Sequence, residues 1–342
     1  MLTPNVVPDF TGLRVAVVGD LIADHYVYGQ PTRLSREAPV MVLRHSGESY
    51  GAGGAANVAR NLWALGAQTT LFGAVGRDYT GRELVRLLDQ EEIDLAGVQT
   101  VSGWITPTKT RILGAERGRT MHQVLRIDRE PSAPLGEEIQ TAIAARLRRL
   151  VGKVDAVLVS DYGYGVAGES VAAAASELRE AGAIVVLDPR RNYAPFRGAT
   201  AMTPNLAELA DATKNCLDDL GDMDSVRAAA MEFIEQNKPE TLLVTMGNRG
   251  MALFSVDFPL GVSITAAGSE SVVDVSGAGD TAAAALTLAL AAGLEGPRAM
   301  RLANAASGIV VMESGTATCP LSKLRSALAG APQPKAVAVP IA

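Results

Sequence analysis

Short apolar runs alternate with segments of helical periodicity along most of the chain. We predict strands over residues 13–18, 70–75, 156–160, 184–188 and 242–245, because short apolar runs bounded by turn residues are typical of buried parallel strands. Helical spacing covers residues 55–65, 82–91, 137–150, 169–181, 225–236, 281–292 and 297–312. The alternation predicts an α/β protein with a doubly wound, mainly parallel sheet and helices on both of its faces.

Two stretches interrupt this alternation. Residues 40–44 and 108–127 alternate apolar and polar positions with no helix between strands, as half-exposed antiparallel strands do. We predict that strands from about 25–48 and 100–128 form a small β-sheet lid over the main domain. That domain is expected to span residues 1–330, and the Pro/Ala-rich tail over 331–342 is expected to carry no chemistry.

Composition and charge exclude several classes of protein. The chain has 342 residues, 48% hydrophobic and 20% charged, which is a globular composition. The net charge of −6, with no long basic run, provides no electrostatic footprint for a nucleic-acid partner. Cys216 and Cys319 are too few for a disulfide framework and lack metal-binding spacing.

The sequence shows neither a secretory signal nor a stretch that is long and apolar enough to span a membrane. The N-terminal segment MLTPNVVPDFTG has neither the basic nor the apolar region of a secretory signal. The longest apolar stretch, residues 282–292, falls short of the roughly 20 residues that span a bilayer. We therefore expect a cytoplasmic protein without membrane or nucleic-acid partners, acting on small molecules.

The segment Asp274-Val-Ser-Gly-Ala-Gly-Asp280-Thr281 joins a glycine-rich turn to an Ala-rich helix. Such a turn leaves backbone N–H groups unpaired, and the helix dipole adds partial positive charge. It therefore predicts an anion-binding cradle. An acid at its mouth, Asp280, is unsuited to phosphate but suited to accepting a proton from an attacking hydroxyl. The alternative is that Asp280 only caps the helix, since Asp is a favoured N-cap residue.

Four motifs in order resemble the ribokinase-like (PfkB) carbohydrate kinases. DVSGAGDT resembles the C-terminal signature of that family, and Gly53-Gly54-Ala-Ala-Asn57 resembles its N-terminal GG signature. Residues 203–208 (TPNLAE) resemble its N-x-x-E motif and residues 245–250 (TMGNRG) its nucleotide loop. The resemblance spans roughly residues 13–325 and implies a ribokinase-like fold that transfers the terminal phosphoryl group of ATP to a sugar hydroxyl.

The resemblance also implies roles for individual residues. Asp280 would deprotonate the acceptor hydroxyl, while the backbone N–H groups of Gly277, Ala278 and Gly279 would stabilise charge on the transferred phosphoryl group. Glu208, together with Asn205, would position Mg²⁺ through waters, since Mg²⁺ gives up its hydration shell reluctantly. The residues expected to bind ATP are Asn205, Thr245, Gly247, Gly250, Asn304 and Ser307, of which Asn304 and Ser307 would lie beside adenine.

The sugar is expected to bind near the first strand and the GG signature. Gly53 and Gly54 would let the backbone approach sugar hydroxyls, and Asn57 would hydrogen-bond them. Asp20 and Asp24 would add carboxylate acceptors. A dinucleotide fingerprint at the same glycines fails on context, because no apolar strand leads directly into them.

Within the family, residues 17–43 are most similar to kinases that phosphorylate heptose 7-phosphate at the anomeric hydroxyl, giving heptose 1,7-bisphosphate. The likeness continues at residues 160–165 (SDYGYG) and 187–191 (LDPRR), and Asp161 joins the expected substrate-binding residues. Two positions depart from that pattern, since Tyr164 and Arg190 stand where a Lys is expected. A phosphorylated sugar needs cations, and the candidates in or near the lid are Arg33, Arg36, Lys109, Arg111 and Arg126.

Other readings of the family resemblance remain open. The acceptor would instead be another sugar or a nucleoside, or the chain would be a catalytically silent sugar- or nucleotide-binding regulator on the same fold. A K⁺ site is implied by the likeness of certain loops to those that hold potassium in relatives, namely Asp274, the Ser276 carbonyl and Ser314-Gly315. An exposed lid edge would favour a homodimer through the lid.

Overall fold

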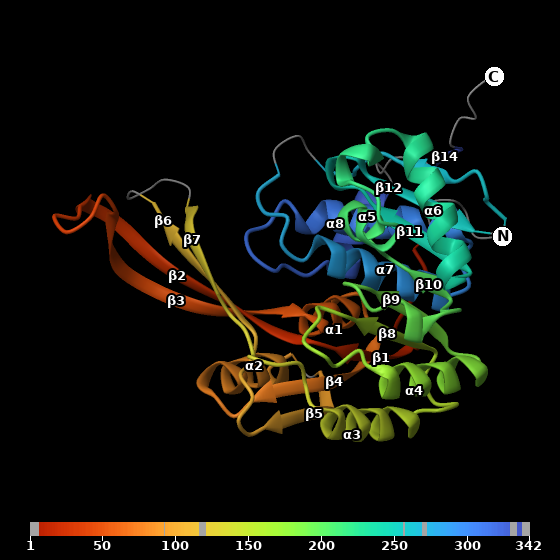
Figure 1. The fold of residues 1–342 in the computed structure, drawn as a ribbon, viewed down its shortest axis with the longest axis horizontal. Coiled ribbons are helices and arrows are strands. Elements are labelled where there is room, and N and C mark those ends of the chain that lie inside the picture. The colour runs from red at the N-terminus through yellow and green to blue at the C-terminus, as the bar shows by residue number, and fades with distance from the viewer. Residues whose placement is uncertain are drawn as a thin grey trace.

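The computed structural model describes residues 7–91, 93–115, 121–255, 257–268, 272–328 and 334–336. A large sheet runs through the main body (Figure 1). In spatial order the described strands of this sheet are β14 (Lys335–Ala336), β13 (Val262–Ile264), β12 (Met251–Ser255), β11 (Thr241–Thr245), β10 (Ala201–Met202), β9 (Ile184–Asp188), β8 (Ala156–Ser160), β1 (Arg14–Gly19), β4 (Gln68–Gly76) and β5 (Asp94–Val101).

The sheet is parallel from β11 to β5, and β12, β13 and β14 extend it antiparallel. Helices cover both faces (Figure 1), which confirms the predicted doubly wound α/β fold. The described helices are α1 (Ala55–Ala64), α2 (Tyr79–Asp89), α3 (Glu137–Arg148), α4 (Glu169–Glu180), α5 (Leu206–Ala212), α6 (Met223–Asn237), α7 (Ala278–Ala291), α8 (Gly296–Val310) and α9 (Leu321–Leu328).

Two apolar cores lie on opposite faces of this sheet. Along β1, Val15 and Val17 belong to the core packed under α1, α7 and α8, whereas Ala16 and Val18 belong to the core packed under α3, α4 and α6. Successive side chains of a strand point to opposite faces, so a central strand buried on both sides must be apolar at every position. This is the origin of the uninterrupted apolar runs in the sequence.

Helix α7 begins three residues earlier than its periodicity predicts. Its N-cap is Gly277, in the left-handed region at φ 78°, and no side chain caps the first turn. Asp280 therefore lies inside the first turn of α7 and is not its N-cap. The alternative in which Asp280 merely caps the helix is wrong.

The second sheet is the lid, and it projects from the body as a long arm (Figure 1). Its strands follow the order β3 (Met41–Gly54), β2 (Leu21–Leu34), β6 (Thr108–Gly114) and β7 (His122–Arg129). Strand β2 pairs antiparallel with β3 and parallel with β6, and β6 pairs antiparallel with β7. Residues 116–120 of the predicted lid lie outside the described residues.

The lid joins the body at two points near the expected sugar site. Asp20 is the single residue between β1 and β2, and the Gly53-Gly54 pair ends β3 where α1 begins. Residues 331–333 and 337–342 of the predicted tail lie outside the described residues, while Lys335 and Ala336 form β14 beside β13. None of the helices formed by described residues is both long and apolar enough to cross a membrane.

Candidate active site

Four acidic residues are placed at the edge where the strands of the main sheet end. Asp20 follows β1, Asp161 follows β8, Asp188 ends β9, and Asp280 lies in the first turn of α7. The carboxyl ends of parallel strands meet at one edge of a sheet, which is where ligands bind in open α/β folds. Burial raises the pKa of Asp188 well above its usual value, and the nearby charges of Asp280, Glu208 and Asp161 add to that increase.

Both carboxylate oxygens of Asp280 accept a hydrogen bond from a side chain. The Asn57 amide Nδ2 donates to Oδ2 at 2.8 Å, and the Tyr162 hydroxyl donates to Oδ1 at 2.9 Å. Burial raises the pKa of Asp280 to about 6, although both hydrogen bonds oppose the increase. A carboxylate with a pKa near the working pH is suited to act as a general base.

The glycine-rich turn leaves amides exposed to a ligand, but not all the predicted ones. The N–H of Ala278 donates to the Val275 carbonyl at 3.3 Å, so the expectation that Ala278 forms part of the cradle is wrong in this structure. Within the described part of the chain, the amides of Gly277, Gly279 and Asp280 have no hydrogen-bond partner. Unpaired amides at the start of a helix form an anion site.

Gly277 is the position of the turn that tolerates no side chain. Its φ of 78° is left-handed, and a Cβ there would lie 2.4 Å from the Asn57 Nδ2. Asn57 therefore packs against this turn and binds Asp280. Its own Oδ1 accepts a hydrogen bond from the Asn61 Nδ2 at 3.3 Å. In place of the predicted hydrogen bond to a sugar, Asn57 here donates to Asp280.

Asp20 organises a loop instead of facing open space. It has no exposed surface, and its oxygens accept the backbone N–H groups of Tyr162, Tyr164 and Val166 at 2.8, 3.0 and 3.1 Å. The expectation that Asp20 offers its carboxylate to sugar hydroxyls is therefore wrong. Burial raises the pKa of Asp20 to about 6 against these three hydrogen bonds.

Asp161 likewise holds two loops together. Its Oδ1 accepts the Gly163 amide at 2.9 Å, and its Oδ2 accepts the amides of Arg190 and Arg191 at 3.2 and 3.5 Å. Only 6% of Asp161 is exposed. Its predicted contact with the substrate is therefore replaced in this structure by loop contacts.

The GG signature is buried where the lid joins the body. A Cβ on Gly54, at φ 56°, would lie 2.6 Å from the Asp20 carbonyl, and one on Gly53 would lie 2.8 Å from Asp24 Oδ2. Both glycines are buried. The close approach that they allow in this structure is between segments of this chain, and an approach to sugar hydroxyls stays a prediction.

The base of the lid contributes a buried ion pair and a lysine. Arg111 pairs with Asp24, and both side chains are at least nine-tenths buried. Burial raises the pKa of Asp24, while Arg111 acts in the opposite direction. Lys109 lies with its Nζ 5.0 Å from the centroid of the Tyr162 ring. Burial lowers the pKa of Lys109, and the charges of Asp24 and Asp280 oppose this.

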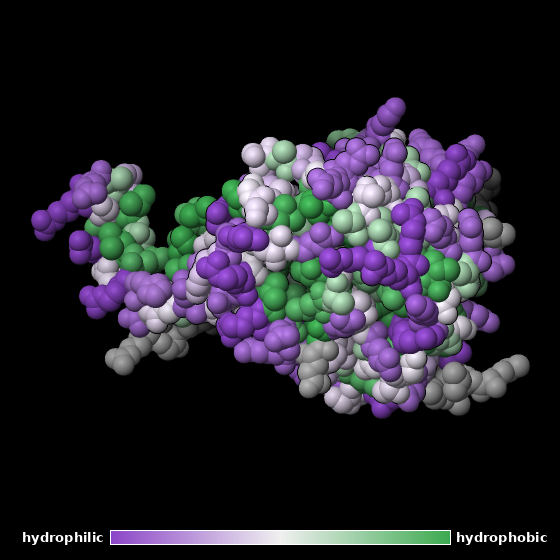
Figure 2. Space-filling view, turned by 90° about the horizontal axis from the view of Figure 1, so that it is seen from below, coloured by the Kyte–Doolittle hydropathy of each residue, from purple (hydrophilic) through white to green (hydrophobic). Residues whose placement is uncertain are grey.

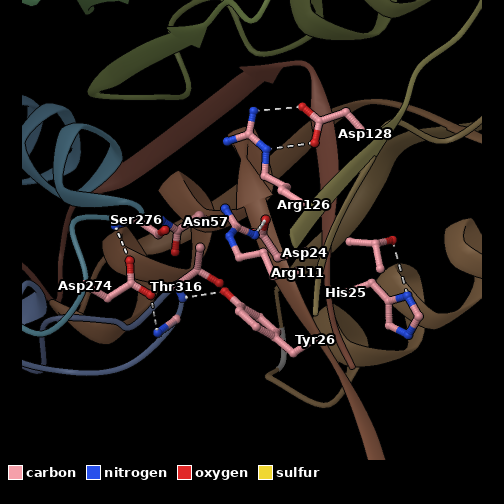
Figure 3. A network of polar contacts seen from close by, with 12 residues as sticks. Asp24, His25, Tyr26, Asn57, Arg111, Arg126, Asp128, Asp274, Ser276 and Thr316 are labelled. Atoms are coloured by element: carbon pink, nitrogen blue, oxygen red, sulfur yellow. Dashed lines mark hydrogen bonds and ion pairs between the residues drawn. The ribbon is translucent and has the colours of Figure 1, made fainter. Parts of the chain in front are cut away.

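Figure 3 shows how this lid network reaches the predicted K⁺ loops. The Arg111 guanidinium lies 5.5 Å from the Tyr26 ring, and the Tyr26 hydroxyl accepts the Thr316 amide at 3.2 Å. Asp274 accepts the amides of Ser276 and Gly315, both at 2.9 Å, and thereby joins the two segments. Although burial opposes it, these hydrogen bonds hold the pKa of Asp274 below its usual value. Ser314 is exposed.

The N-x-x-E motif forms a capping box at the start of α5. Asn205 Oδ1 accepts the Glu208 amide at 3.0 Å, and Glu208 Oε2 accepts the Asn205 amide at 2.9 Å. Burial raises the pKa of Glu208, partly offset by the Asn205 hydrogen bonds and Arg190. No cluster of three metal-ligating side chains forms among the described residues.

Two predicted adenine contacts are already engaged with the protein. The Asn304 Nδ2 donates to the Thr265 carbonyl at 3.0 Å, and the Ser307 hydroxyl donates to the Ala278 carbonyl at 2.9 Å. Ser307 therefore supports the anion-binding turn, and Asn304 holds the segment after β13. The expectation that both side chains face adenine is not met in this structure.

The nucleotide loop divides into an open and a closed part. Gly247 has φ 59° and open space where a Cβ would stand, whereas a Cβ on Gly250 would lie 2.0 Å from the Ile264 carbonyl. Thr245 donates its amide to the Pro204 carbonyl at 3.0 Å, which brings this loop beside Asn205. Gly247 is thus the position that a ligand can approach, and Gly250 is required by the packing of β13.

The remaining predicted lid cations lie in two places: Arg126 lies opposite Arg111, whereas Arg33 and Arg36 lie near the lid tip. Arg126 pairs with Asp128 through Nε and Nη2 at 2.8 and 2.9 Å and lies opposite Arg111 in the β6–β7 register. Arg33 follows Asp24 along β2 by nine residues, or about 30 Å at the rise of a strand. Arg33 and Arg36 are exposed near the lid tip, so the expectation that Arg33 lies with Asp24 at the sugar site is wrong.

The fold, the open amides of the glycine turn and the buried carboxylate beside it define a carbohydrate kinase of the ribokinase-like class. Residues 13–324 match the pfkB family of carbohydrate kinases, and the chain belongs to this family. Membership of this family classes the chain as a carbohydrate kinase.

Among curated proteins, the chain is similar to the bifunctional protein HldE of Mesorhizobium japonicum, with 38% identity over 321 residues that cover 93% of this chain and 62% of the relative. It is 40% identical to the bifunctional protein HldE of Paramagnetospirillum magneticum over 309 residues, 90% of this chain and 61% of the relative. The chain thus spans about three fifths of the length of these relatives.

Two solved structures show the same fold. Phosphofructokinase-2 from Escherichia coli in complex with substrates and products superposes with a TM-score of 0.74 and 20% identity, covering 93% of this chain and 99% of that one. Ribokinase of Arabidopsis thaliana with ribose and ATP superposes with a TM-score of 0.69 and 20% identity, covering 92% and 98%.

The raised pKa of Asp280 predicts a pH-dependent cost of folding. Between about pH 4 and pH 6 the folded protein holds a proton that the unfolded chain has lost, so stability falls as the pH rises through this window. A shift from 3.8 to about 6 corresponds to roughly 3 kcal/mol. Asp280→Asn cannot ionise, and its free energy of unfolding should rise relative to wild type by up to that amount between pH 4 and pH 7.

Urea unfolding of both proteins at several pH values measures this difference. Asp20, with a similar pKa, titrates in both proteins and cancels. A stability difference that stays constant across the window contradicts the buried, ionising carboxylate.

Proposed function

We propose that this kinase transfers the γ-phosphoryl group of ATP to the anomeric hydroxyl of heptose 7-phosphate, giving heptose 1,7-bisphosphate and ADP. The observation that carries the chemistry is Asp280, a buried carboxylate held by two donors beside the open amides of the glycine turn. The choice of sugar is supported by the sequence resemblance over residues 17–43 and by the similarity to the HldE proteins.

The reaction needs a base and a site for negative charge. The acceptor hydroxyl oxygen attacks the γ-phosphorus, the bond from that phosphorus to the bridging β-phosphate oxygen breaks, and ADP leaves. The hydroxyl proton passes to Asp280, whose carboxylate keeps lone pairs beyond those used by Asn57 and Tyr162. The amides of Gly277 and Gly279 would stabilise charge on the transferred group.

The residues present fit a hydrated Mg²⁺ better than a directly coordinated one. Asn205 and Glu208 are bonded to each other. Burial, together with repulsion from neighbouring acids that include Asp161, raises the pKa of both Asp188 and Glu208. A cation held through waters would relieve this repulsion. Bound Mg²⁺ would supply charge neutralisation for the ATP phosphates. K⁺ beside Asp274 is a further proposal, supported by the ionised carboxylate that ties residues 276 and 315.

The proposed sugar site lies between the lid base and Asp280. Lys109 is a lid cation on which the charges of both Asp24 and Asp280 act. Arg111 is engaged with Asp24. Arg126 is half-exposed on the same lid face and is our candidate for the 7-phosphate.

We also propose a homodimer through the lid. The lid carries a set of exposed large apolar side chains, visible as green surface on the projecting part of Figure 2. The apolar residues are Leu34, Val40, Met41, Met121, Val124, Leu125 and Ile127. Apolar side chains gathered on a projecting sheet favour burial against a second sheet.

The first kinetic prediction concerns the base. Asp280→Asn should lower kcat by at least about 10²-fold, the usual scale for a positioned base, while ATP binds as tightly as before. ADP release and ATP calorimetry measure the two quantities, with Asp218→Asn on the exposed surface as the matched control. An unchanged kcat rules out Asp280 as the base. ATP binding without ADP release by the wild type, for every sugar tested, would favour a silent regulator.

The second kinetic prediction concerns the sugar phosphate. Charge-assisted hydrogen bonds contribute about 1.5 to 3 kcal/mol, so Arg126→Ala should lower kcat/KM for heptose 7-phosphate by about 10-fold to 150-fold. The loss for unphosphorylated heptose should be much smaller, and Arg33→Ala at the lid tip is the control. Equal losses on both sugars, or better turnover of ribose, fructose or a nucleoside by the wild type, contradict the heptose 7-phosphate proposal.

The dimer proposal predicts that charges on the lid dissociate it. The double change Leu125→Asp with Ile127→Asp should convert a dimer to a monomer in analytical ultracentrifugation, because buried carboxylates without partners are costly. Val151→Asp, at an exposed apolar position on the body, should leave the mass unchanged. A wild-type protein that sediments as a monomer at micromolar concentration contradicts the proposal.

A further inference from the structure

Tyr162 contacts the proposed base, and no motif or family role described above assigns it a part. It follows β8, and its hydroxyl donates to Asp280 Oδ1 at 2.9 Å, while Asn57 serves Oδ2. Each oxygen of Asp280 therefore has one side-chain donor. Without Tyr162, Oδ1 would lose its donor in a buried environment, where an unsatisfied charged group is costly.

The backbone of Tyr162 is fixed independently of this contact. Its amide donates to Asp20 Oδ2 at 2.8 Å, and the amide of Tyr164 donates to the same oxygen at 3.0 Å. Asp20 is fully buried between β1 and β2. The loop that carries Tyr162 is thus held at the junction of the body and the lid, which aims the phenol ring at α7.

The Tyr162 ring also contacts the lid. Lys109 of β6 lies 5.0 Å from the ring centroid, within range of a cation–π contact. The charged or titratable groups that act on Asp280 are therefore Tyr162 itself, Lys109 of β6, Asp24 of β2 and Asp188 at the end of β9. Of these, only Tyr162 touches the carboxylate.

We propose that Tyr162 is a positioning residue for phosphoryl transfer, whose hydroxyl orients the Asp280 carboxylate and favours its ionised form. This inference rests on the proposed role of Asp280 as the base. A fixed donor on one oxygen leaves the carboxylate in a single orientation, with its remaining lone pairs available to the acceptor hydroxyl.

Tyr162 keeps its own proton throughout. Burial raises the pKa of Tyr162 well above its usual value, and the charge and hydrogen bond of Asp280 add to the increase. The proton of the acceptor hydroxyl therefore goes to Asp280, and the phenol remains a donor before and after transfer. Tyr162 acts through Asp280 and is not itself a base.

The test is Tyr162→Phe, which removes the donor and keeps the ring. Loss of a hydrogen bond to a charged group should raise the pKa of Asp280 by about 1 to 2 units, so the acid limb of kcat/KM should move to higher pH by that amount. With a wild-type pKa of about 6, activity at pH 6 should fall by about 5-fold to 50-fold and return close to the wild-type value at pH 9.

Tyr164→Phe is the matched control. The Tyr164 hydroxyl donates to Glu130 at 2.7 Å, outside the Asp280 contacts, so this variant should keep the wild-type acid limb. Ionisation of ATP and of the acceptor, heptose 7-phosphate, contributes equally to every curve and cancels in the comparison. A merely structural role for Tyr162 would lower the rate at all pH values without moving the limb.

A second readout needs no turnover. Carboxyl ¹³C NMR titration of Asp-labelled protein, with the Asp280 signal assigned by its loss in Asp280→Asn, should show the same upward shift in Tyr162→Phe and none in Tyr164→Phe. An unchanged titration or acid limb in Tyr162→Phe overturns the positioning role. If Asp280→Asn keeps full activity, the base assignment fails instead, and the NMR titration still reports whether the phenol acts on the carboxylate.

Discussion

The burial of an ionisable carboxylate at the start of α7 is the constraint on which the rest of the site depends. A carboxylate removed from water needs donors on both oxygens, and those of Asp280 come from α1 and from the loop after β8. Because Asn57 must reach Asp280 across the glycine turn, Gly277 has no room for a Cβ. The glycine at that position thus allows the contact between Asn57 and Asp280 and also leaves the amides of the turn open.

The same constraint explains the junction between body and lid. Asp20 lies where the chain passes from β1 to β2, and three backbone amides of residues 162–166 satisfy its oxygens. Its own carbonyl accepts the amide of Ala55 at 3.1 Å, which requires glycine at position 54. One buried acid therefore fixes the start of the lid, the start of α1 and the loop that carries Tyr162.

The sequence predicts local features of this protein better than contacts between distant segments. Apolar runs and the DVSGAGDT turn are local, so the central strands and the position of Asp280 could be predicted. Asn57 and Asp280 are 223 residues apart, and nothing in either motif indicates that one binds the other. The contacts of Asp20 and Asn304 could not be predicted for the same reason. The sequence does not show whether a polar side chain near a site faces a ligand or holds a loop. Strand β2 was hard to predict because its outer half is exposed and lacks a regular apolar face.

The lid is divided into a base that contacts the body and a tip that projects away from it (Figure 1). At the base, Asp24 and Arg111 pair within the lid, while the Tyr26–Thr316 and Lys109–Tyr162 contacts each reach a different part of the body. Register irregularities follow at one level of the sheet, at Tyr28/Gly29 between β2 and β3 and at Ile112/Leu113 between β6 and β7, and such bulges bend a strand. Separating Arg111 from Asp24 would leave buried charges unpaired, so the base is held by electrostatics. The tip has exposed apolar side chains instead, and burial against another surface is what those side chains favour.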